Sequence, residues 1–255
     1  MKFVAITRAV SDAINSCELT HLAREPIDLD RARAQHRAYE HALEAAGCDI
    51  VRAAPAPQLP DAVFVEDIAI VLDEVAIITR PGAVSRHEET TGVALVLREY
   101  RNLRFIFEPG TIDGGDVVVA GRQVFIGRSS RTNGAGIEQA RGILYPFGYT
   151  VTEVEVRGCL HLKSAATTLS GNQLLVNPAW IPAGAFNSLE LLEIDPREPQ
   201  AANILRAGDH YIYSSAFPRT ADVLRRSGLQ LDSVDMRELA KAEGAVTCCS
   251  ILVTV

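Results

Sequence analysis

The stretch VVVAGRQVFIGRS, residues 117–129, contains two short apolar runs separated by the polar turn Gly121-Arg122-Gln123. Runs rich in β-branched residues on either side of a Gly-containing turn are typical of a β-hairpin. The second run passes through Gly127 and ends in the polar pair Arg128-Ser129. We therefore predict a hairpin whose second strand is closed by polar residues.

The same pattern of strand, turn and strand recurs along the chain. Residues 76–81, 174–178 and 211–215 are apolar runs with polar endings, and each follows a polar turn and another apolar run. Residues 3–9 have the same form but lack a first strand. We expect residues 250–255, an apolar run at the C-terminus, to supply that missing strand.

The polar positions that close these second strands are regularly spaced. They fall at 8, 80, 128, 177 and 214, so the steps from 80 to 128 and from 128 to 177 are 48 and 49 residues. The step from 214 through the two chain ends back to 8 is also 49 residues. A period of about 20–50 residues indicates repeated units that bury their apolar faces against one another.

Helical segments are expected between the hairpins. Apolar residues at helical spacing predict helices over 30–47, 88–100, 136–148 and 220–228. Together the elements predict an α/β fold of five ββαβ-type units with mixed sheets, a five-bladed α/β-propeller that forms a single domain over residues 1–255. The alternative is an ordinary α/β domain, in which strands and helices also alternate at this spacing.

Composition excludes several classes of protein. With 47% hydrophobic and 22% charged residues the chain has the balance of a soluble globular protein. The net charge of −7 and the absence of a basic cluster argue against a nucleic-acid partner. No apolar run approaches the roughly 18 residues of a membrane span. The five cysteines form no C-x-x-C pair, so neither a metal site nor a disulfide framework is indicated, and we expect a cytoplasmic chain.

Cys248 is the candidate nucleophile. It lies with Cys249 where a Gly-containing turn enters the last apolar run, so a side chain there can face a central cleft. A cysteine with a lowered pKa attacks electron-poor carbon. Neighbouring residues of a strand face opposite ways, so at most one of the two lines the cleft. The alternative is that both are small core residues.

His161 lies between Leu160 and Leu162, and it is the one histidine that we expect on a strand facing the ring axis. The alternative is that His161 is a hydrogen-bonded core residue.

Acidic residues stand at equivalent strand entrances of two successive units. Turn formation explains Asp-Gly-Gly-Asp, but not Glu-Asp between apolar residues. Buried acids need a cationic partner, and guanidinium pairs best with carboxylates. These acids are Asp61, Glu66, Asp67, Asp113 and Asp116.

Arg86 and Arg131 follow the second strands of their units, in loops that would rim the same cleft. Two arginines there could hold a carboxylate, although solvated loop charges are the alternative. Acids below and arginines above would fit a zwitterion with a cationic tail, which is an arginine-like molecule.

At these residues the sequence resembles the dimethylarginine dimethylaminohydrolase family, guanidino-group modifying enzymes with the five-bladed propeller called the pentein fold. The resemblance implies that the ring surrounds a central substrate channel. Its most specific motifs are Phe64-Val65-Glu66-Asp67 and Leu160-His161-Leu162-Lys163. The likeness runs nearly end to end and also covers residues 21–22, 60–63, 78–83, 109–116, 126–133 and 247–250.

The resemblance implies a role for each matching residue. Cys248 would be the nucleophile, His161 the acid and base, and Asp113 the carboxylate beside the guanidinium, a position that is Glu in some members. The remaining roles are backbone groups from Leu22 and Ala242, polar contacts from Asp61, Glu66 and Asp67, and a carboxylate clamp from Arg86 and Arg131. Ala242 replaces a larger aliphatic residue common in the family.

The implied reaction converts Nω,Nω-dimethyl-L-arginine, or the monomethyl form, to L-citrulline and an amine through a covalent Cys thiouronium, with no metal or organic cofactor. Two alternatives stand beside it. An arginine deiminase would use the same groups on unmethylated arginine, but that family is longer and has a helical insertion. The other alternative is a non-catalytic ring that only binds.

The step from position 8 to position 80 is the longest and includes an insertion at 11–30, which is a candidate lid over the cleft. Pairing of edge surfaces would give a homodimer.

Overall fold

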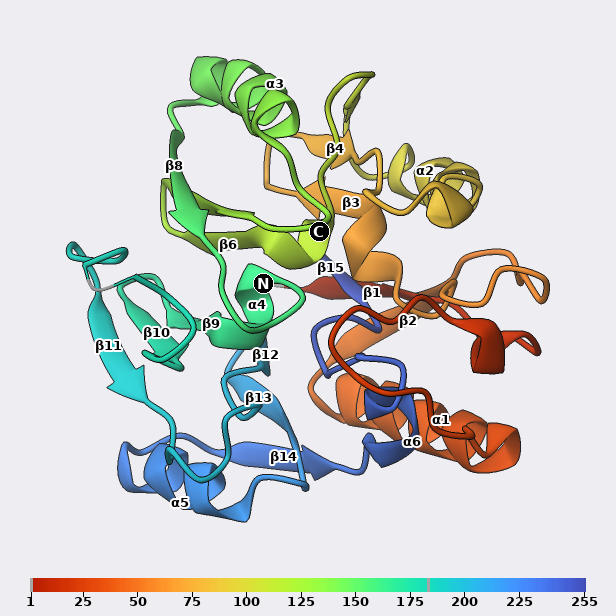
Figure 1. Ribbon diagram of the computed structural model, residues 1–255, viewed down its shortest axis with the longest axis vertical. Helices are drawn as coiled ribbons and strands as arrows, with labels where there is room; N and C mark the ends of the chain where they lie inside the picture. The colour runs from red at the N-terminus through yellow and green to blue at the C-terminus, as the bar shows by residue number, and fades with distance from the viewer. Residues whose placement is uncertain (1, 183) are drawn as a thin grey trace.

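The structure is a computed structural model that describes residues 2–182 and 184–255. Five three-stranded sheets are arranged in a ring around a central axis (Figure 1). In each sheet the middle strand pairs antiparallel with the inner strand and parallel with the outer one. From inner to outer, the strands are β15 (Ile251–Thr254), β1 (Phe3–Thr7) and β2 (Cys48–Arg52); β3 (Ala69–Val71), β4 (Ala76–Ile78) and β5 (Leu103–Phe105); β6 (Val117–Ala120), β7 (Gln123–Arg128) and β8 (Thr150–Glu155); β9 (Ala166–Ser170), β10 (Gln173–Val176) and β11 (Glu190–Glu193); β12 (Ile204–Ala207), β13 (His210–Ser214) and β14 (Leu231–Val234).

The two ends of the chain complete one sheet. β15 pairs antiparallel with β1, in a register that places Phe3 opposite Thr254 and Ile6 opposite Ile251. The prediction that the C-terminal run supplies the missing strand is confirmed. The stretch 117–129 forms the hairpin of β6 and β7, and its polar closing residue Arg128 is the last residue of β7.

The longer helices lie on the outside of the ring and join middle strands to outer ones (Figure 1). They lie within a few residues of the predicted segments. A left-handed Gly47 (φ 86°) follows the first of them, and the Asn133 side chain accepts from the N–H of Gly136 to begin the third. They are α1 (Leu29–Ala45), α2 (Glu89–Leu97), α3 (Gly134–Leu144) and α5 (Pro218–Arg226).

Shorter helices lie nearer the axis or at the edges of the units. They are α4 (Leu162–Ala165) and α6 (Arg237–Ala240), with the single 3-10 turns η1 (Ile14–Ser16), η2 (Val65–Ile68), η3 (Val84–Arg86), η4 (Gly114–Asp116) and η5 (Tyr145–Phe147). No helix in the described part of the chain is both long enough and apolar enough to cross a membrane.

The core lies between neighbouring sheets and under the outer helices. One cluster joins Ile77 of β4, Val124 and Ile126 of β7, and Ile137 of α3. Middle strands such as β4 are buried along their whole length because both faces are covered. They therefore read as continuous apolar runs rather than as alternating ones, which is why the sequence shows them clearly.

Candidate active site

The candidate side chains come from equivalent points of different units, immediately before the inner strands. η2 precedes β3, η4 precedes β6, α4 precedes β9, and the turn at 245–248 precedes β15. The units repeat around one axis (Figure 1), and residues from these strand entrances line one shared cavity. This repeat brings together residues that are far apart in the sequence.

Two local predictions need correction. His161 does not lie on a strand: it is the N-cap residue of α4, with an extended backbone (φ −133°, ψ 159°). Cys248 lies in a turn closed by its own N–H to the carbonyl of Ala245 (3.2 Å), before β15 begins at Ile251. Both side chains are presented by irregular backbone, which can aim a group at the axis more freely than a strand.

His161 is buried among carboxylates. Its Nε2 lies 3.0 Å from Oδ2 of Asp113, and its Nδ1 lies 3.7 Å from Oδ1 of Asp67. Burial lowers the pKa of His161, but the charges of Asp67 and Asp116 and the hydrogen bond to Asp113 outweigh it and raise the pKa to about 9. At neutral pH the imidazole is therefore protonated and can donate a proton.

Gly115 allows this close approach. A Cβ at this position would lie 2.5 Å from Nδ1 of His161 and 2.7 Å from Oδ1 of Asp67. Its backbone N–H also donates to Oδ1 of Asp67 (3.0 Å). The sequence suggests Gly115 only as a turn residue. The structure requires glycine at this position because the backbone lies directly against the imidazole and leaves no room for a side chain.

Asp113 and Asp116 are fixed by hydrogen bonds from neighbouring loops. Oδ1 of Asp113 accepts the N–H of Gly82 (2.9 Å). Oδ2 of Asp116 accepts the hydroxyls of Ser129 and Thr132 (both 2.6 Å), and its Oδ1 accepts the N–H of Leu162 (3.0 Å), next to His161. Burial raises the pKa of Asp116 to about 6. Asp116 thus anchors the α4 segment that carries His161.

Cys248 is partly exposed, whereas Cys249 is fully buried, so one of the two faces the cavity as predicted. The Cys248 sulfur accepts the N–H of Ala245 (3.4 Å). Burial and the charges of Glu66 and Asp67 nevertheless raise the pKa of the Cys248 thiol well above its usual value. The thiol is therefore neutral at pH 7 in the site as the structure has it.

A small cavity of about 20 Å³ joins these groups. It has room for about one water molecule. Most of the predicted site residues meet in it, together with residues that were not predicted. Its lining, here called the catalytic cavity, is formed by Glu18, Asp61, Phe64, Asp67, Arg86, Arg131, Leu160, His161, Ala242, Glu243, Gly244 and Cys248.

The two predicted clamp arginines differ in their partners. Arg86 is buried and donates to Asp67 (2.6 Å) and Glu89 (2.9 Å), so protein carboxylates already engage its guanidinium. Arg131 is also buried, and its Nη2 donates to the hydroxyl of Thr20 (3.1 Å). Within the described residues Arg131 pairs with no carboxylate, which leaves its charge available to an anionic ligand.

Arg86 has a clear effect on Asp67. Burial raises the pKa of this carboxyl, but His161 and Arg86 outweigh that effect and lower the pKa. Asp67 is therefore charged beside the cavity. Asp61 also lines the cavity, and its Oδ2 accepts the N–H of Glu18 (3.1 Å), although burial raises its pKa.

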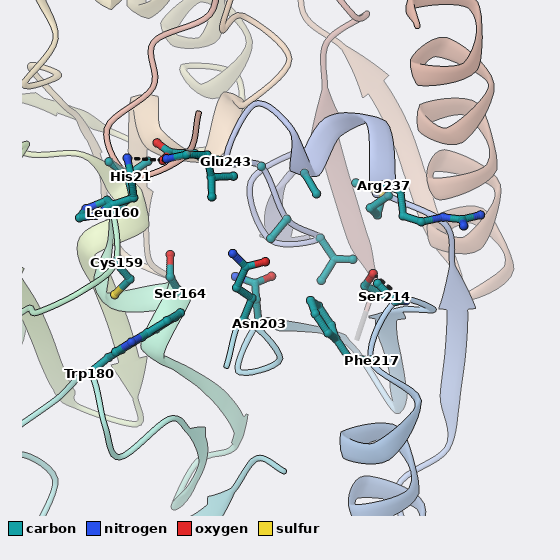
Figure 2. Close-up of a pocket in the computed structure, with 18 of the residues that line it drawn as sticks. His21, Cys159, Leu160, Ser164, Trp180, Asn203, Ser214, Phe217, Arg237 and Glu243 are labelled. Atoms are coloured by element: carbon teal, nitrogen blue, oxygen red, sulfur yellow. Dashed lines mark hydrogen bonds between the residues drawn. The ribbon is translucent and has the colours of Figure 1, made fainter. Parts of the chain in front are cut away.

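Glu66 and Leu22 lie outside the catalytic cavity. The Glu66 side chain forms an ion pair with Lys163 and lines a separate cavity further along the axis. Consecutive residues of the η2 turn point to different sides, so Asp67 faces the catalytic cavity and Glu66 does not. Burial raises the pKa of Glu66 to about 7. Leu22 lines a larger neighbouring cavity of about 310 Å³. Figure 2 shows this cavity, with His21, Trp180 and Glu243 among the residues around it.

Sequence reasoning named neither Glu18 nor Glu243, and it gave Asp116, one of the candidate acids, no part in holding His161. Glu18 and Glu243 line the catalytic cavity, and Asp116 holds the segment that carries His161. Asp116 belongs to the Asp-Gly-Gly-Asp motif, so its position was a signal. Glu18 and Glu243 lie in irregular segments whose sequence carries no such signal.

Three buried side chains place potential metal-ligand atoms within 4.8 Å of one another: the carboxylates of Asp67 and Asp113 and the imidazole of His161. A metal ion would have to displace the proton that the raised pKa of His161 retains at neutral pH. This competition favours the imidazolium over a metal ligand.

The ring of five units, with cysteine, histidine and carboxylates at its axis, has the five-bladed propeller architecture called the pentein fold. The N-terminal domain of ArgZ, a cyanobacterial arginine dihydrolase, shares the fold with a TM-score of 0.89 over 99% of this chain and 98% of that one, at 17% identity. No family model matches the chain.

Sequence relatives narrow the class. A Streptomyces coelicolor N(G),N(G)-dimethylarginine dimethylaminohydrolase is 40% identical over 250 residues, which cover 97% of this chain and 95% of the relative. The Pseudomonas aeruginosa enzyme of the same name is 34% identical over 246 residues, covering 96% and 95%. The chain belongs to the dimethylarginine dimethylaminohydrolase family.

Solved structures agree with this assignment. A cysteine-to-serine variant of the Pseudomonas aeruginosa enzyme, complexed with citrulline, matches with a TM-score of 0.91 and 33% identity over 99% of this chain and 100% of that one. The resemblance inferred from the motifs and the predicted five-bladed fold are both confirmed.

Proposed function

We propose that the whole chain acts as one catalytic domain that hydrolyses Nω,Nω-dimethyl-L-arginine and Nω-monomethyl-L-arginine to L-citrulline and dimethylamine or methylamine. The observation that carries this proposal is the catalytic cavity, where a thiol, a protonated histidine and an ionised aspartate face one another. A guanidinium-specific site needs these three groups. Membership of the family supports the choice of substrate.

Substrate binding changes the charge balance of the cavity. A cationic guanidinium beside Asp67 offsets the negative charges that raise the pKa of Cys248. The thiol then loses its proton to solvent water more readily, and the thiolate lies next to the N–H of Ala245. In this proposal the substrate activates the nucleophile that attacks it. Asp61 and Asp67 hold the guanidinium in its protonated, electrophilic form.

Arg131 would bind the substrate carboxylate, because it is buried without a carboxylate partner in the described chain. Arg86 would act mainly through Asp67, whose charge it maintains. Leu22 and Ala242 would contribute backbone groups to the same substrate. Glu66 is proposed as an indirect contributor, since its side chain lies outside the catalytic cavity.

The chemistry has two halves. The Cys248 thiolate forms a bond to the guanidinium carbon, and the C–N bond to the amine breaks as His161 donates its proton to the leaving nitrogen. A thiouronium linked to Cys248 remains. Neutral His161 then takes a proton from water, the resulting hydroxide adds to the carbon, and the C–S bond breaks to release citrulline. Asp113 stabilises the imidazolium in both halves.

A substrate comparison tests the proposal. Citrulline release is measured from the dimethyl, monomethyl and unmethylated forms of arginine with the wild-type protein. We expect kcat/KM to be highest for a methylated form and lower for arginine by about tenfold or more. A preference for unmethylated arginine would favour the deiminase reaction instead, and release from none of the three would refute the proposal.

All five cysteines are free, which suits a reducing compartment, so we propose a cytoplasmic location.

Self-association of the protein as a homodimer also stays a prediction, and sedimentation velocity would check it.

A further inference from the structure

Glu243 holds the tip of the inserted segment through its carboxylate. Oε2 accepts the N–H of Thr20 (2.9 Å), and Oε1 accepts those of His21 (2.5 Å) and Leu22 (2.8 Å). Three consecutive backbone N–H groups thus point at one side chain. Figure 2 shows Glu243 beside His21, on the opposite side of the neighbouring cavity from Trp180.

The other hydrogen bonds of this segment, residues 18–26, all involve side chains. Arg24 donates to the carbonyls of Asn15 and Cys17, Lys241 donates to the carbonyl of Pro26, and Arg131 donates to the hydroxyl of Thr20. None of the backbone N–H groups of residues 18–26 donates a hydrogen bond to a backbone carbonyl of the described chain, and residues 20–26 are exposed. Segments with few buried contacts and exposed backbone open at low free-energy cost. Within the described chain, Glu243 therefore makes all of the hydrogen bonds to the backbone of Thr20–Leu22.

The backbone of Glu243 is strained. It has a φ of 58°, and it is the one non-glycine residue with positive φ in the described chain. It follows α6, with its N–H bonded to the carbonyl of Ala240 (3.1 Å), at a position where glycine is usual. A long acidic residue costs stability in this conformation, so its carboxylate must contribute something that glycine would not.

The position of Glu243 connects two parts of the proposed substrate site. It follows Ala242 in the chain and bonds to the N–H of Leu22, and these are the two residues proposed to contribute backbone groups. Its side chain also lines both the catalytic cavity and the neighbouring cavity. One carboxylate therefore fixes the spacing between Leu22 and Ala242.

We propose that Glu243 is a positioning residue that latches Thr20–Leu22 over the catalytic cavity and thereby sets the affinity for substrate. This inference rests on the proposed function. The cavity of about 20 Å³ is too small for an amino acid, so the segment must open for entry and close afterwards. Losing the latch lowers the closed fraction, which weakens apparent binding.

The variant Glu243→Gly separates the effect of backbone strain from the effect of the lost carboxylate contacts. Glycine relieves the left-handed backbone, so the thermal midpoint should be unchanged or higher. We expect KM to rise about tenfold or more, with kcat changed by less than about threefold. Glu243→Gln retains one oxygen that accepts two of the three N–H groups, so its KM should be intermediate.

Limited proteolysis gives a readout that does not depend on activity. Arg24 lies in the exposed segment, and trypsin should cleave after it about tenfold faster in Glu243→Gly than in the wild type. Glu25→Gln, on the same segment, is the matched control, because Glu25 makes no hydrogen bond in the described chain. It should leave KM and the cleavage rate unchanged.

The latch is overturned if Glu243→Gly keeps both KM and the rate of cleavage at Arg24 within about twofold of the wild type. A loss confined to kcat, with unchanged cleavage, would also overturn it. If the wild type releases no citrulline, the proposed function fails, while the cleavage rates still decide whether Glu243 holds the segment.

Discussion

Nε2 of His161 lies 3.0 Å from Oδ2 of Asp113, and both side chains are buried. This contact helps to raise the pKa of His161 to about 9, so the imidazole stays protonated through neutral pH. A general acid that must protonate an amine leaving group needs such a proton. The pair therefore accounts for the first half of the proposed reaction.

Asp113→Asn should lower the pKa of His161, because it removes a negative charge and its hydrogen bond. A lower pKa means that the imidazolium loses its proton at lower pH, so the alkaline limb of the kcat profile should move to lower pH. We expect kcat at pH 7.5 to fall about tenfold or more. The measurement is the pH dependence of citrulline release.

Asp232→Asn is the matched control for this variant. Asp232 lies 2.7 Å from Nδ1 of His210, but both residues are on the surface and away from the cavity. Its pH profile should coincide with that of the wild type. An unchanged alkaline limb in Asp113→Asn would contradict the role given to the buried pair.

Gly115→Ala should disable the site with a small effect on the fold. The new Cβ would press on Nδ1 of His161 (2.5 Å) and on Oδ1 of Asp67 (2.7 Å), so the imidazole must move. A displacement of about 1 Å can reduce the rate about a hundredfold, and we expect a loss of that size in kcat.

Gly142→Ala provides the comparison for Gly115→Ala. Gly142 lies in α3 and a Cβ there meets nothing within 4 Å, so alanine should stabilise the helix by about 1 kcal/mol and leave kcat unchanged. Wild-type turnover in Gly115→Ala would show that the imidazole is not held as the structure places it.

Asp116 should link stability to pH. Burial raises its pKa in the folded state to about 6, above the ordinary value of 3.8 for an aspartate, so its protonated form favours the folded state. This contribution is present below pH 3.8 and is lost as the pH rises through 6. Relative to Asp116→Asn, which cannot ionise, the wild type should lose unfolding free energy between these values.

Urea unfolding at a series of pH values measures this difference. Asp116→Ala should cost about 2 kcal/mol at acidic pH, because it leaves the N–H of Leu162 and two hydroxyls without their acceptor. A pH-independent difference between wild type and Asp116→Asn would contradict the buried, protonatable carboxyl.

The Cys248 thiol should react slowly in the free protein. Its raised pKa keeps it neutral at pH 7, so alkylation by iodoacetamide should accelerate as the pH rises well above neutrality. Glu66→Gln removes one of the charges that raise this pKa and should speed alkylation at pH 8, whereas Glu153→Gln, on β8, should not. Mass spectrometry of the Cys248 peptide gives the rate, and equal rates in both variants would count against this electrostatic account.

The sequence predicts the ring because its middle strands are buried on both faces and read as apolar runs with regular spacing. It also indicates that Asp67 and Asp113 stand at strand entrances, since the repeat places them at equivalent points. It could not show that Arg86 is engaged by Glu89 or that Glu66 turns toward Lys163, because these depend on side-chain packing across units.

The backbone around the two reactive groups, His161 and Cys248, could not be predicted from the sequence either. His161 and Cys248 lie in turns rather than strands, and the pKa of the thiol depends on burial and on Glu66, which no local pattern encodes. Glu243 is least visible in the sequence. Its partners lie more than two hundred residues away in the chain. Its backbone is left-handed, but the residue is not a glycine, so the sequence does not indicate this conformation.

The covalent intermediate is the central claim, and trapping it is the most direct test. Wild type, Cys249→Ser and Cys248→Ser are mixed with dimethylarginine, quenched in acid within a turnover, and analysed as intact protein and as peptides. The account predicts an amidine adduct on Cys248 in wild type and in Cys249→Ser, and neither adduct nor citrulline in Cys248→Ser. An adduct on Cys249, or citrulline formation by Cys248→Ser at the wild-type rate, would contradict it.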